Sequence, residues 1–162
     1  MIVRDARAAD TPAIAEIWNH NIRHTANTFT TAEKTPEGLA RDIETRRAEG
    51  KGFLVAEDGK DIVGFATYFQ FRGGPGYAFT AEHSVMLAEA AMGKGTGRAL
   101  MEALEAHARG AGMHSLIAGV AGENAAGIAF HAALGYRTIA VLPEVGRKFE
   151  RWMDLTLMQK ML

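Results

Sequence analysis

A glycine-rich segment suited to binding an anion stands between an apolar strand pattern and a helical pattern. It comprises Gly93, Lys94, Gly95, Thr96, Gly97 and Arg98. Glycines let a backbone approach a ligand closely, and the first N–H groups of a helix are unpaired and carry partial positive charge. Lys94 and Arg98 add formal charge, and no acidic residue interrupts the segment. The segment therefore predicts a binding site for a pyrophosphate, named here the anion cradle.

Two well-known phosphate-binding loops do not fit this segment. A P-loop places Gly-Lys-Ser/Thr after a four-residue gap from its first glycine, and that arrangement is absent. A Rossmann fingerprint needs glycine where Arg98 stands and opens a parallel βαβ unit, whereas this segment lies in mid-chain after several strands. The pyrophosphate of coenzyme A is a third reading, and a turn that only caps a helix is the simplest alternative.

Apolar periodicity predicts the elements that would position the anion cradle. Strands are expected at residues 2–7, 53–57, 62–71, 77–87, 115–121, 136–142 and 151–158. Helices are expected at residues 10–22, 35–50, 97–108 and 124–134. A charged loop is expected to join the last two strands. This order predicts an α/β (α+β) fold whose mixed, mostly antiparallel central sheet is flanked by helices.

Composition narrows the possible partners and compartments. A length of 162 residues suits one domain over residues 1–162. The formal charge of −1 argues against nucleic acid and anionic membranes, because both require a basic surface. The absence of cysteine excludes disulfides, thiolate metal sites and cysteine nucleophiles. No apolar run reaches the ~18 residues of a membrane span, and the first residues do not suggest a signal peptide, so a cytoplasmic protein is expected.

The segment from Met92 to Gly97 resembles the signature of the GNAT family of N-acetyltransferases. That signature reads Gln/Arg-x-x-Gly-x-Gly between the fourth strand and the third helix. Met92 replaces its first polar residue, which removes one side chain and leaves the backbone cradle intact. The expected order of elements also resembles this family across essentially the whole chain. The resemblance implies the GNAT acyl-CoA N-acyltransferase fold, with acetyl-CoA as co-substrate and an amine as acceptor.

Five further segments resemble the subgroup of this family that acetylates phosphinothricin and methionine sulfoximine. They are Asn19-His20-Asn21-Ile22, Thr28-Phe29, Thr80-Ala81-Glu82-His83-Ser84-Val85, Asn124 through Tyr136, and Val145 through Leu155. The subgroup implies as acceptor the α-amino group of a small amino acid or analogue, of the phosphinothricin, methionine sulfoximine or methionine sulfone type.

Acyl transfer from a thioester to an amine needs a neutral amine, a stabilised oxyanion and a proton for the departing thiolate. Glu82 is the expected base, acting directly or through water, because apolar strand neighbours would raise its pKa. His83 is the rival base, although adjacent strand residues face opposite ways and only one of the two should face the substrate. His131 stands where many relatives carry a tyrosine that protonates the thiolate. A histidine that only packs in a helix is its alternative reading.

The cofactor contacts follow from the resemblance alone. In the family, pantetheine pairs with the fourth strand like an added strand, which assigns Val85, Met86 and Leu87 to coenzyme A. The backbone N–H of Met86 or Leu87 would then stabilise the oxyanion. Asn124 touches coenzyme A in the family and also suits the N-cap of a helix.

The binding site for the acceptor is expected near Arg72, at the end of the strand before it. The guanidinium of Arg72 would bind a substrate carboxylate as a bidentate fork. The subgroup often carries a second basic or aromatic residue two to four positions later, whereas Gly73 and Gly74 begin a small, flexible stretch here that would enlarge the pocket. Phe29 would supply an apolar wall. The expected substrate contacts are therefore Phe29, Arg72, Gly73, Gly74 and Glu82.

Two other residue groups are interpreted more simply. His20 and His24 have the spacing of a metal pair, yet the His-Glu-x-x-His pattern and a third ligand are missing, so no metal site is expected. Arg147, Lys148 and Arg151 are interpreted as part of a solvated loop or an interface. In the resembled subgroup this loop reaches the entrance of a partner's active site, which implies a homodimer.

Three alternative functions remain. An N-acetyltransferase of protein N-termini would need a groove open at both ends, and one of polyamines would need a site lined with acids. A non-catalytic acyl-CoA-binding module would bind the cofactor tightly and release no free thiol with any amine.

Overall fold

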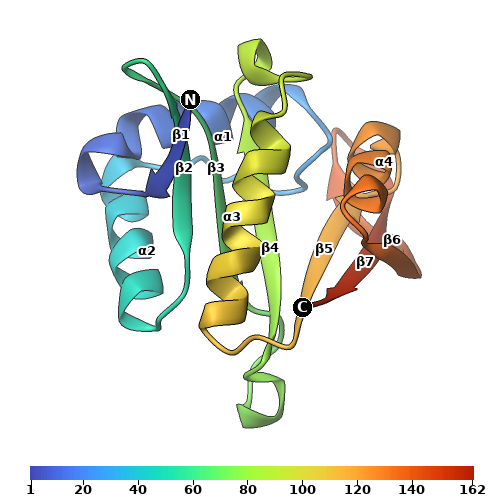
Figure 1. Ribbon diagram of the computed structural model, residues 1–162. Helices are drawn as coiled ribbons and strands as arrows, with labels where there is room; N and C mark the ends of the chain where they lie inside the picture. Colours follow the sequence, from blue (N-terminus) through green and yellow to red (C-terminus); the bar gives the residue numbers. More distant parts are fainter.

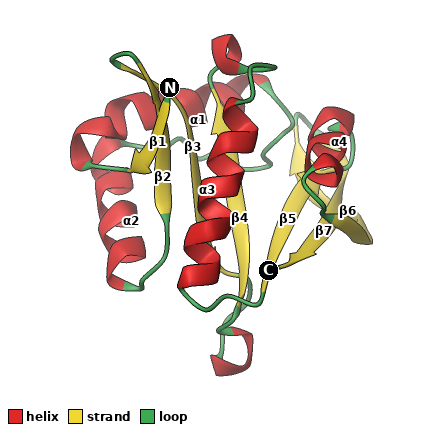
Figure 2. Cartoon of the chain, in the orientation of Figure 1, coloured by secondary structure: helices red, strands yellow, loops and turns green.

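The computed structural model describes all 162 residues and contains one seven-stranded sheet covered by helices on both faces (Figures 1 and 2). The strands lie in the order β1-β2-β3-β4-β5-β7-β6. They are β1 (Ile2–Asp5), β2 (Phe53–Asp58), β3 (Asp61–Gln70), β4 (Thr80–Leu87), β5 (Ser115–Ala121), β6 (Arg137–Lys148) and β7 (Arg151–Met161). The helices are α1 (Thr11–His24), α2 (Pro36–Ala48), α3 (Thr96–Gly110) and α4 (Ala125–Ala133).

Each face of the sheet has its own apolar core. The larger core joins α3 to the sheet and includes Tyr68, Leu100 and Leu116. The smaller core joins α1 and α2 to the opposite face and includes Ile14 and Phe65. Alternation along β3 sends Phe65 and Tyr68 to different cores, as a strand covered on both faces requires. None of the helices combines the length and the apolar character that a membrane span requires.

The neighbouring strands β4 and β5 separate halfway along their length. They form the one parallel pair in the sheet, and the pairing joins only Thr80–His83 to Ser115–Ala118. On its other side, β4 stays paired with β3 as far as Leu87. Figure 1 shows the two strands close together at one end and diverging toward the other. The backbone of residues 84–87 therefore has a free edge facing β5.

The last hairpin differs from the expectation. β6 extends to Lys148 instead of ending at Leu142, so the charged loop expected there was wrong. An edge strand exposes its outward side chains to water, and charges therefore do not oppose its pairing. A register shift between Leu142 and Gly146 accommodates the proline between them. Phe149 and Glu150 form the turn with φ of 51° and 60°.

The loop between β3 and β4 also differs slightly from the expected pattern. β4 begins at Thr80 rather than residue 77, because Pro75–Tyr77 forms a short 3-10 helix. The side-chain amide of Gln70 donates to the carbonyls of Arg72 and Gly74, at 2.7 Å each. The loop that contains Arg72 is thus tied to the end of β3.

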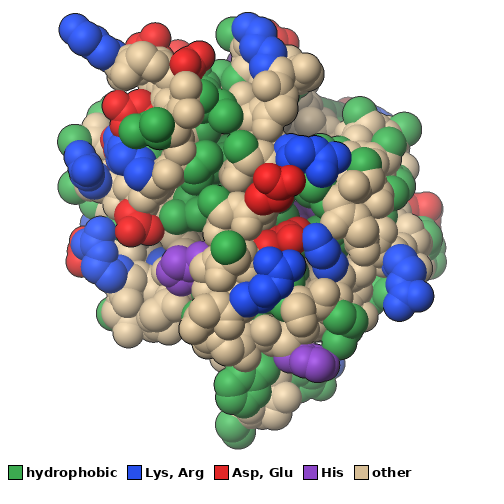
Figure 3. All heavy atoms as spheres, in the orientation of Figure 1, with side chains coloured by type: hydrophobic (Ala, Val, Ile, Leu, Met, Phe, Trp, Pro, Cys, Tyr) green, Lys and Arg blue, Asp and Glu red, His purple; other side chains and the backbone are tan.

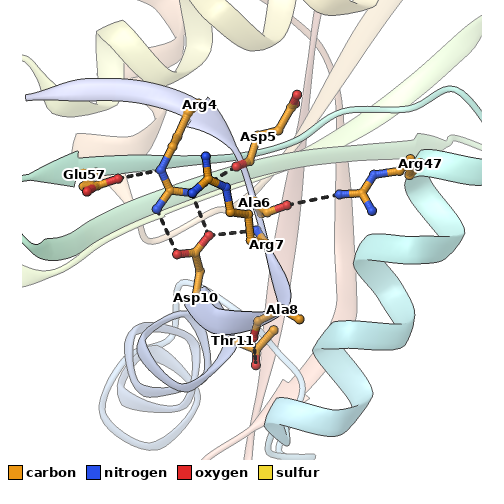
Figure 4. A network of polar contacts seen from close by, with 9 residues as sticks. All are labelled: Arg4, Asp5, Ala6, Arg7, Ala8, Asp10, Thr11, Arg47 and Glu57. Atoms are coloured by element: carbon orange, nitrogen blue, oxygen red, sulfur yellow. Dashed lines mark hydrogen bonds and ion pairs between the residues drawn. The ribbon is translucent and has the colours of Figure 1, made fainter.

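A network of charged groups fastens β1 to β2 and to the start of α1 (Figure 4). The guanidinium of Arg4 donates to both carboxylate oxygens of Asp10, at 2.8 and 2.9 Å, and to Glu57 at 2.5 Å. Asp10 also accepts the backbone N–H of Arg7 at 2.8 Å, and its side chain does not cap α1. The hydrogen bond from Arg4 lowers the pKa of Asp10.

We expect Asp10→Asn to lower the free energy of unfolding by about 2 kcal/mol, which is typical for losing a hydrogen bond to a charged group. Because the folded-state pKa is lowered, the stabilisation is present above the unfolded pKa of about 4 and is lost as the pH falls through the folded value. Urea denaturation of both proteins at neutral pH and at the lowest pH that preserves the fold measures this. A difference independent of pH would contradict the role of the ion pair.

Candidate active site

The carboxylate of Glu82 lies where β4 and β5 begin to separate. Glu82 pairs with Ile117, one position before the pairing of the two strands ends. Its side chain extends over β5, so that a Cβ added to Gly119 would stand 2.9 Å from Oε1. Burial raises the pKa of Glu82, and neither a hydrogen bond nor a nearby positive charge offsets the effect. The carboxylate is therefore unpaired and partly desolvated, as a general base would need to be.

Gly119 was not predicted as a residue of the site, although its position inside a strand carries a signal. A glycine inside an apolar strand pattern often marks a close approach to the backbone. Here the approaching group is the Glu82 carboxylate on one side, and Leu155 of β7 stands 3.6 Å from the same Cβ position. Gly119 thus provides the space that the proposed base occupies.

Glu82 and His83 lie on opposite faces of the sheet, as alternation along β4 requires. His83 is buried, and its ring stacks on that of His131 with centroids 5.1 Å apart. Tyr136 meets the ring of His83 edge-on at 5.6 Å. Burial lowers the pKa of His83 to about 3, so the ring is neutral near pH 7. These features disfavour His83 as the rival base.

The side chain of His131, a residue of α4, is packed between this helix and the sheet, on the sheet face opposite to the one that carries Glu82. Its Nδ1 lies 2.8 Å from the carbonyl oxygen of Gly127. A carbonyl only accepts, so Nδ1–H is the donor and the neutral ring holds a lone pair at Nε2. Nε2 is buried without a partner in the protein. Burial lowers the pKa of His131, so this ring has no ready proton at Nε2 to give.

The anion cradle has the predicted position between β4 and α3. Gly93 and Gly95 adopt φ of 72° and 83°, and nothing stands within 4 Å of a Cβ built on either residue. Gly95 is the N-cap of α3, and no side chain caps the helix. Open space and helix N–H groups without a side-chain partner fit a pyrophosphate.

Gly97 joins the anion cradle to the free edge of β4. A Cβ on Gly97 would lie 3.2 Å from the ring of Phe130 in α4 and 3.5 Å from Leu87. Val85 and Leu87 pack on the α3 side of the sheet, and Met86 packs on the α1 side. An open strand edge that leads to an anion cradle matches a ligand with amide groups and a pyrophosphate, as in coenzyme A.

The charged and polar residues around the anion cradle lie at the starts of two helices. Arg98 is 3.7 Å from Glu102 one turn later on α3. On the face of the molecule shown in Figure 3, basic and acidic side chains lie side by side. Asn124 is the N-cap of α4, and its Oδ1 accepts the N–H of Gly127 at 2.9 Å. The capping role expected for Asn124 is therefore confirmed.

The residues expected to contact the acceptor lie in two loops. Arg72, Gly73 and Gly74 are exposed in the loop after β3, where the guanidinium of Arg72 stands 5.6 Å from the ring centroid of Tyr77. Phe29 lies in the loop after α1, and its ring covers Gly146 so closely that an added Cβ would overlap it. The structure thus places Phe29 against the last hairpin.

Lys148 is buried, so the interpretation of this segment as a solvated loop was wrong for that residue. Its Nζ donates to the carbonyls of Thr25 and Thr28 at 2.6 and 2.7 Å. Its two basic neighbours are exposed as expected: Arg151 pairs with Glu123, and Arg147 lies over the ring of Trp152.

His20 and His24 are neighbours on α1 with no third possible metal ligand grouped with them. Their rings lie 4.9 Å apart on one side of α1. No group of three or more His, Asp or Glu side chains in the chain is arranged to hold a metal ion.

The diverging strands, the free edge, the anion cradle and the unpaired carboxylate together are the arrangement expected of an acyl-CoA-dependent transferase. The comparison with protein families agrees: the model described as "Acetyltransferase (GNAT) domain" matches residues 3–157. This chain belongs to the GNAT family of acetyltransferases. The fold and the acetyl-CoA co-substrate that the sequence resemblance implied are thereby confirmed.

Two known proteins are similar over 82% or more of their own length. The L-methionine sulfoximine/L-methionine sulfone acetyltransferase of Salmonella typhimurium is 40% identical over 100% of this chain and 95% of its own. The phosphinothricin N-acetyltransferase of Alcaligenes faecalis is 39% identical over 99% of this chain and 82% of its own.

Two solved structures are similar in fold as well as sequence. An acetyltransferase from Salmonella typhimurium, solved with acetyl-CoA, superposes with a TM-score of 0.97 at 40% identity, covering 100% of this chain and 94% of its own. A ribosomal-protein-alanine N-acetyltransferase from Brucella melitensis gives a TM-score of 0.97 at 38% identity, with 100% of both chains covered.

Proposed function

We propose that this enzyme transfers the acetyl group of acetyl-CoA to the α-amino group of methionine sulfoximine, methionine sulfone or phosphinothricin. The observation that carries the proposal is the unpaired carboxylate of Glu82 at the point where β4 and β5 part. An amine that approaches on the α1 face would meet this base beside the edge assigned to the donor. The relatives of known name supply the acceptor class.

In the proposed mechanism, Glu82 accepts a proton from the acceptor ammonium, directly or through one water. The free amine attacks the thioester carbonyl, and a backbone N–H on the edge of residues 84–87, at Met86 or Leu87, stabilises the oxyanion. The new C–N bond forms, the C–S bond breaks and the thiolate departs. The ammonium loses two protons in all: one leaves through Glu82 to water, and the other ends on the thiol.

For His131 we propose a hydrogen bond to the donor sulfur rather than proton donation. The Gly127 carbonyl holds Nδ1–H, which leaves Nε2 free to accept the S–H of the product thiol. The lowered pKa of the buried ring disfavours the imidazolium that a proton donor would require. His131 would then favour the thiol product over the returning thiolate.

We propose for Arg72 the binding of the acceptor carboxylate, with Gly73 and Gly74 leaving room for a side chain of variable size. The Arg72 side chain is exposed, with its Cζ 5.6 Å from the ring centroid of Tyr77, and a solvent-exposed guanidinium can bind a carboxylate as a fork. Free amino acids carry this carboxylate, whereas polyamines do not. The preference for amino acids follows from this contact.

We also propose a homodimer formed through the β6–β7 hairpin. Large apolar side chains are exposed there: Ile139, Val141, Val145, Phe149 and Trp152, each at least 51% accessible. Apolar surface gathered on one hairpin marks an interaction site. We expect sedimentation velocity to give a dimer for the wild type and a monomer for Val141→Lys, with unchanged circular dichroism. A monomeric wild type at micromolar concentration would contradict this proposal.

The acceptor is tested by measuring thiol release from acetyl-CoA with a panel of amines. The panel contains methionine sulfoximine, methionine sulfone, phosphinothricin, the common amino acids, a peptide with N-terminal alanine, and spermidine. We expect the first three to give the highest kcat/KM. Preference for the peptide would favour acetylation of protein N-termini, in line with the similarity to the ribosomal-protein-alanine enzyme. Tight acetyl-CoA binding without turnover of any amine would indicate a binding module.

A further inference from the structure

The geometry points to Lys148 as a positioning residue of the acceptor site. Its buried ammonium fastens the loop after α1 to β6, and the same contact seats the ring of Phe29 beside the sheet face that carries Glu82. The inference rests on the proposed function, because it concerns how the acceptor is enclosed.

The contacts of Lys148 are those of a clamp between distant parts of the chain. The residue is 3% exposed, and its Nζ donates to the carbonyls of Thr25 and Thr28, more than one hundred residues earlier. Thr25 is the C-cap of α1, where the helix concentrates partial negative charge that favours a cation. The ring of Phe149 lies 5.0 Å from the ammonium on another side. A buried cation held in this way is costly to leave unpaired, so the loop stays closed on it.

Gly146 provides a second anchor on the same face of β6. Alternation along the strand places Gly146 and Lys148 on one side. These two are the buried residues of a strand whose other residues are exposed, apart from the half-buried Ala140. The ring of Phe29 fills the space above Gly146 that any side chain would need. The loop is therefore attached at two points, by Lys148 at residues 25 and 28 and by Gly146 at Phe29.

A short path of contacts links this attachment to the proposed base. Gly146 pairs with Met153 of β7. Leu155, two residues later and thus on the same face, lies 3.6 Å from the Cβ position of Gly119, whose other neighbour is the Glu82 carboxylate at 2.9 Å. The loop carrying Phe29 consequently borders the face on which the amine would bind. Lys148 acts through this loop and does not itself touch the reacting atoms.

The test is a comparison of kinetic constants in Lys148→Met. We expect the KM of the acceptor to rise by about tenfold, because the loop that encloses the amine is released and ground-state binding is lost. The dissociation constant of acetyl-CoA should change less than twofold, since the anion cradle lies on another part of the sheet. Lys51→Met is the control: that lysine is partly buried and paired with the carboxylate of Glu49 at 2.8 Å, outside the loop that carries Phe29, and its loss should leave both constants unchanged.

Two further variants separate positioning from a general loss of structure. If Lys148 acts through Phe29, the double variant Lys148→Met/Phe29→Ala should have the acceptor KM of Phe29→Ala alone. Gly146→Ala keeps the ammonium but displaces the ring, and should also raise the acceptor KM; it serves where Lys148→Met does not fold. An unchanged acceptor KM in Gly146→Ala, or additive effects in the double variant, would overturn the inference. A wild type that acetylates no amine would instead refute the proposed function.

Discussion

Replacing Glu82 with glutamine is expected to lower kcat by about 10²–10⁴-fold, the usual contribution of a general base. Glutamine keeps the size and position of the side chain beside Gly119 but cannot accept a proton from the amine. The dissociation constant of acetyl-CoA should stay within twofold, because no contact links this carboxylate to the anion cradle. Single-turnover acetylation and calorimetric binding of acetyl-CoA measure the two quantities.

The pH dependence of kcat tests whether Glu82 is the group that acts as the general base. Burial raises the pKa of Glu82, so kcat should fall as the pH drops through that raised value and the base becomes protonated. This decline of kcat at low pH, the acidic limb of the profile, does not arise from His83, because its pKa of about 3 lies below the range of the decline. Glu82→Gln should remove this limb. Glu44→Gln, at an exposed glutamate paired with Arg47, should keep it.

The stability of Glu82→Gln supplies a further control. An acid with a raised folded-state pKa costs stability once the pH exceeds its unfolded value, so replacement by a neutral amide should leave the melting temperature near pH 7 equal or slightly higher. An inactive variant that also melts at a clearly lower temperature would point to misfolding. A fully active variant would remove Glu82 from the role of base.

Gly95→Val is expected to weaken acetyl-CoA binding by about 100-fold. Gly95 has φ of 83°, and a branched residue in this conformation costs about 1–2 kcal/mol, which favours rearrangement at the start of α3. Its side chain would also enter the open space in front of the helix N–H groups. Calorimetry should show the loss of affinity, while kcat at saturating acetyl-CoA should remain within a few-fold of the wild type.

Gly59→Val is the matched control for this substitution. Gly59 lies in the turn between β2 and β3, has φ of 66° and likewise has nothing within 4 Å of its Cβ position. Both variants therefore carry a similar backbone strain, and we expect similar losses in melting temperature. Only Gly95→Val should lose affinity. Equal affinities in both variants would show that the anion cradle does not hold the pyrophosphate.

The parts of the fold and site that depend on local sequence were accessible before the structure. The helix that follows the anion cradle, the strand that carries Glu82 and the cap at Asn124 each follow from neighbouring residue types. The alternation that separates Glu82 from His83 is equally local. These predictions required no knowledge of distant contacts.

The features that the sequence did not show depend on contacts between distant segments. The two carbonyls that bind Lys148 lie 123 and 120 residues away. Because no local pattern points to them, the charge of Lys148 alone led to the prediction of a solvated side chain. The β6 strand continued past Leu142 because its position at the edge of the sheet tolerates charged and proline residues. The packing of His131 against His83 brings together two motifs that are far apart in the sequence. Patterns within one segment carry none of this information.

We propose that acetyl-CoA and an amino acid of the methionine sulfoximine type react in this enzyme. The most direct test of this reaction is mass spectrometry of the product, with the free thiol quantified in the same reaction. We predict α-N-acetyl methionine sulfoximine and coenzyme A thiol in equal amounts, formed by the wild type and almost absent with Glu82→Gln. Thiol release without the acetylated amino acid, or no reaction with any of the three proposed acceptors, would contradict the claim.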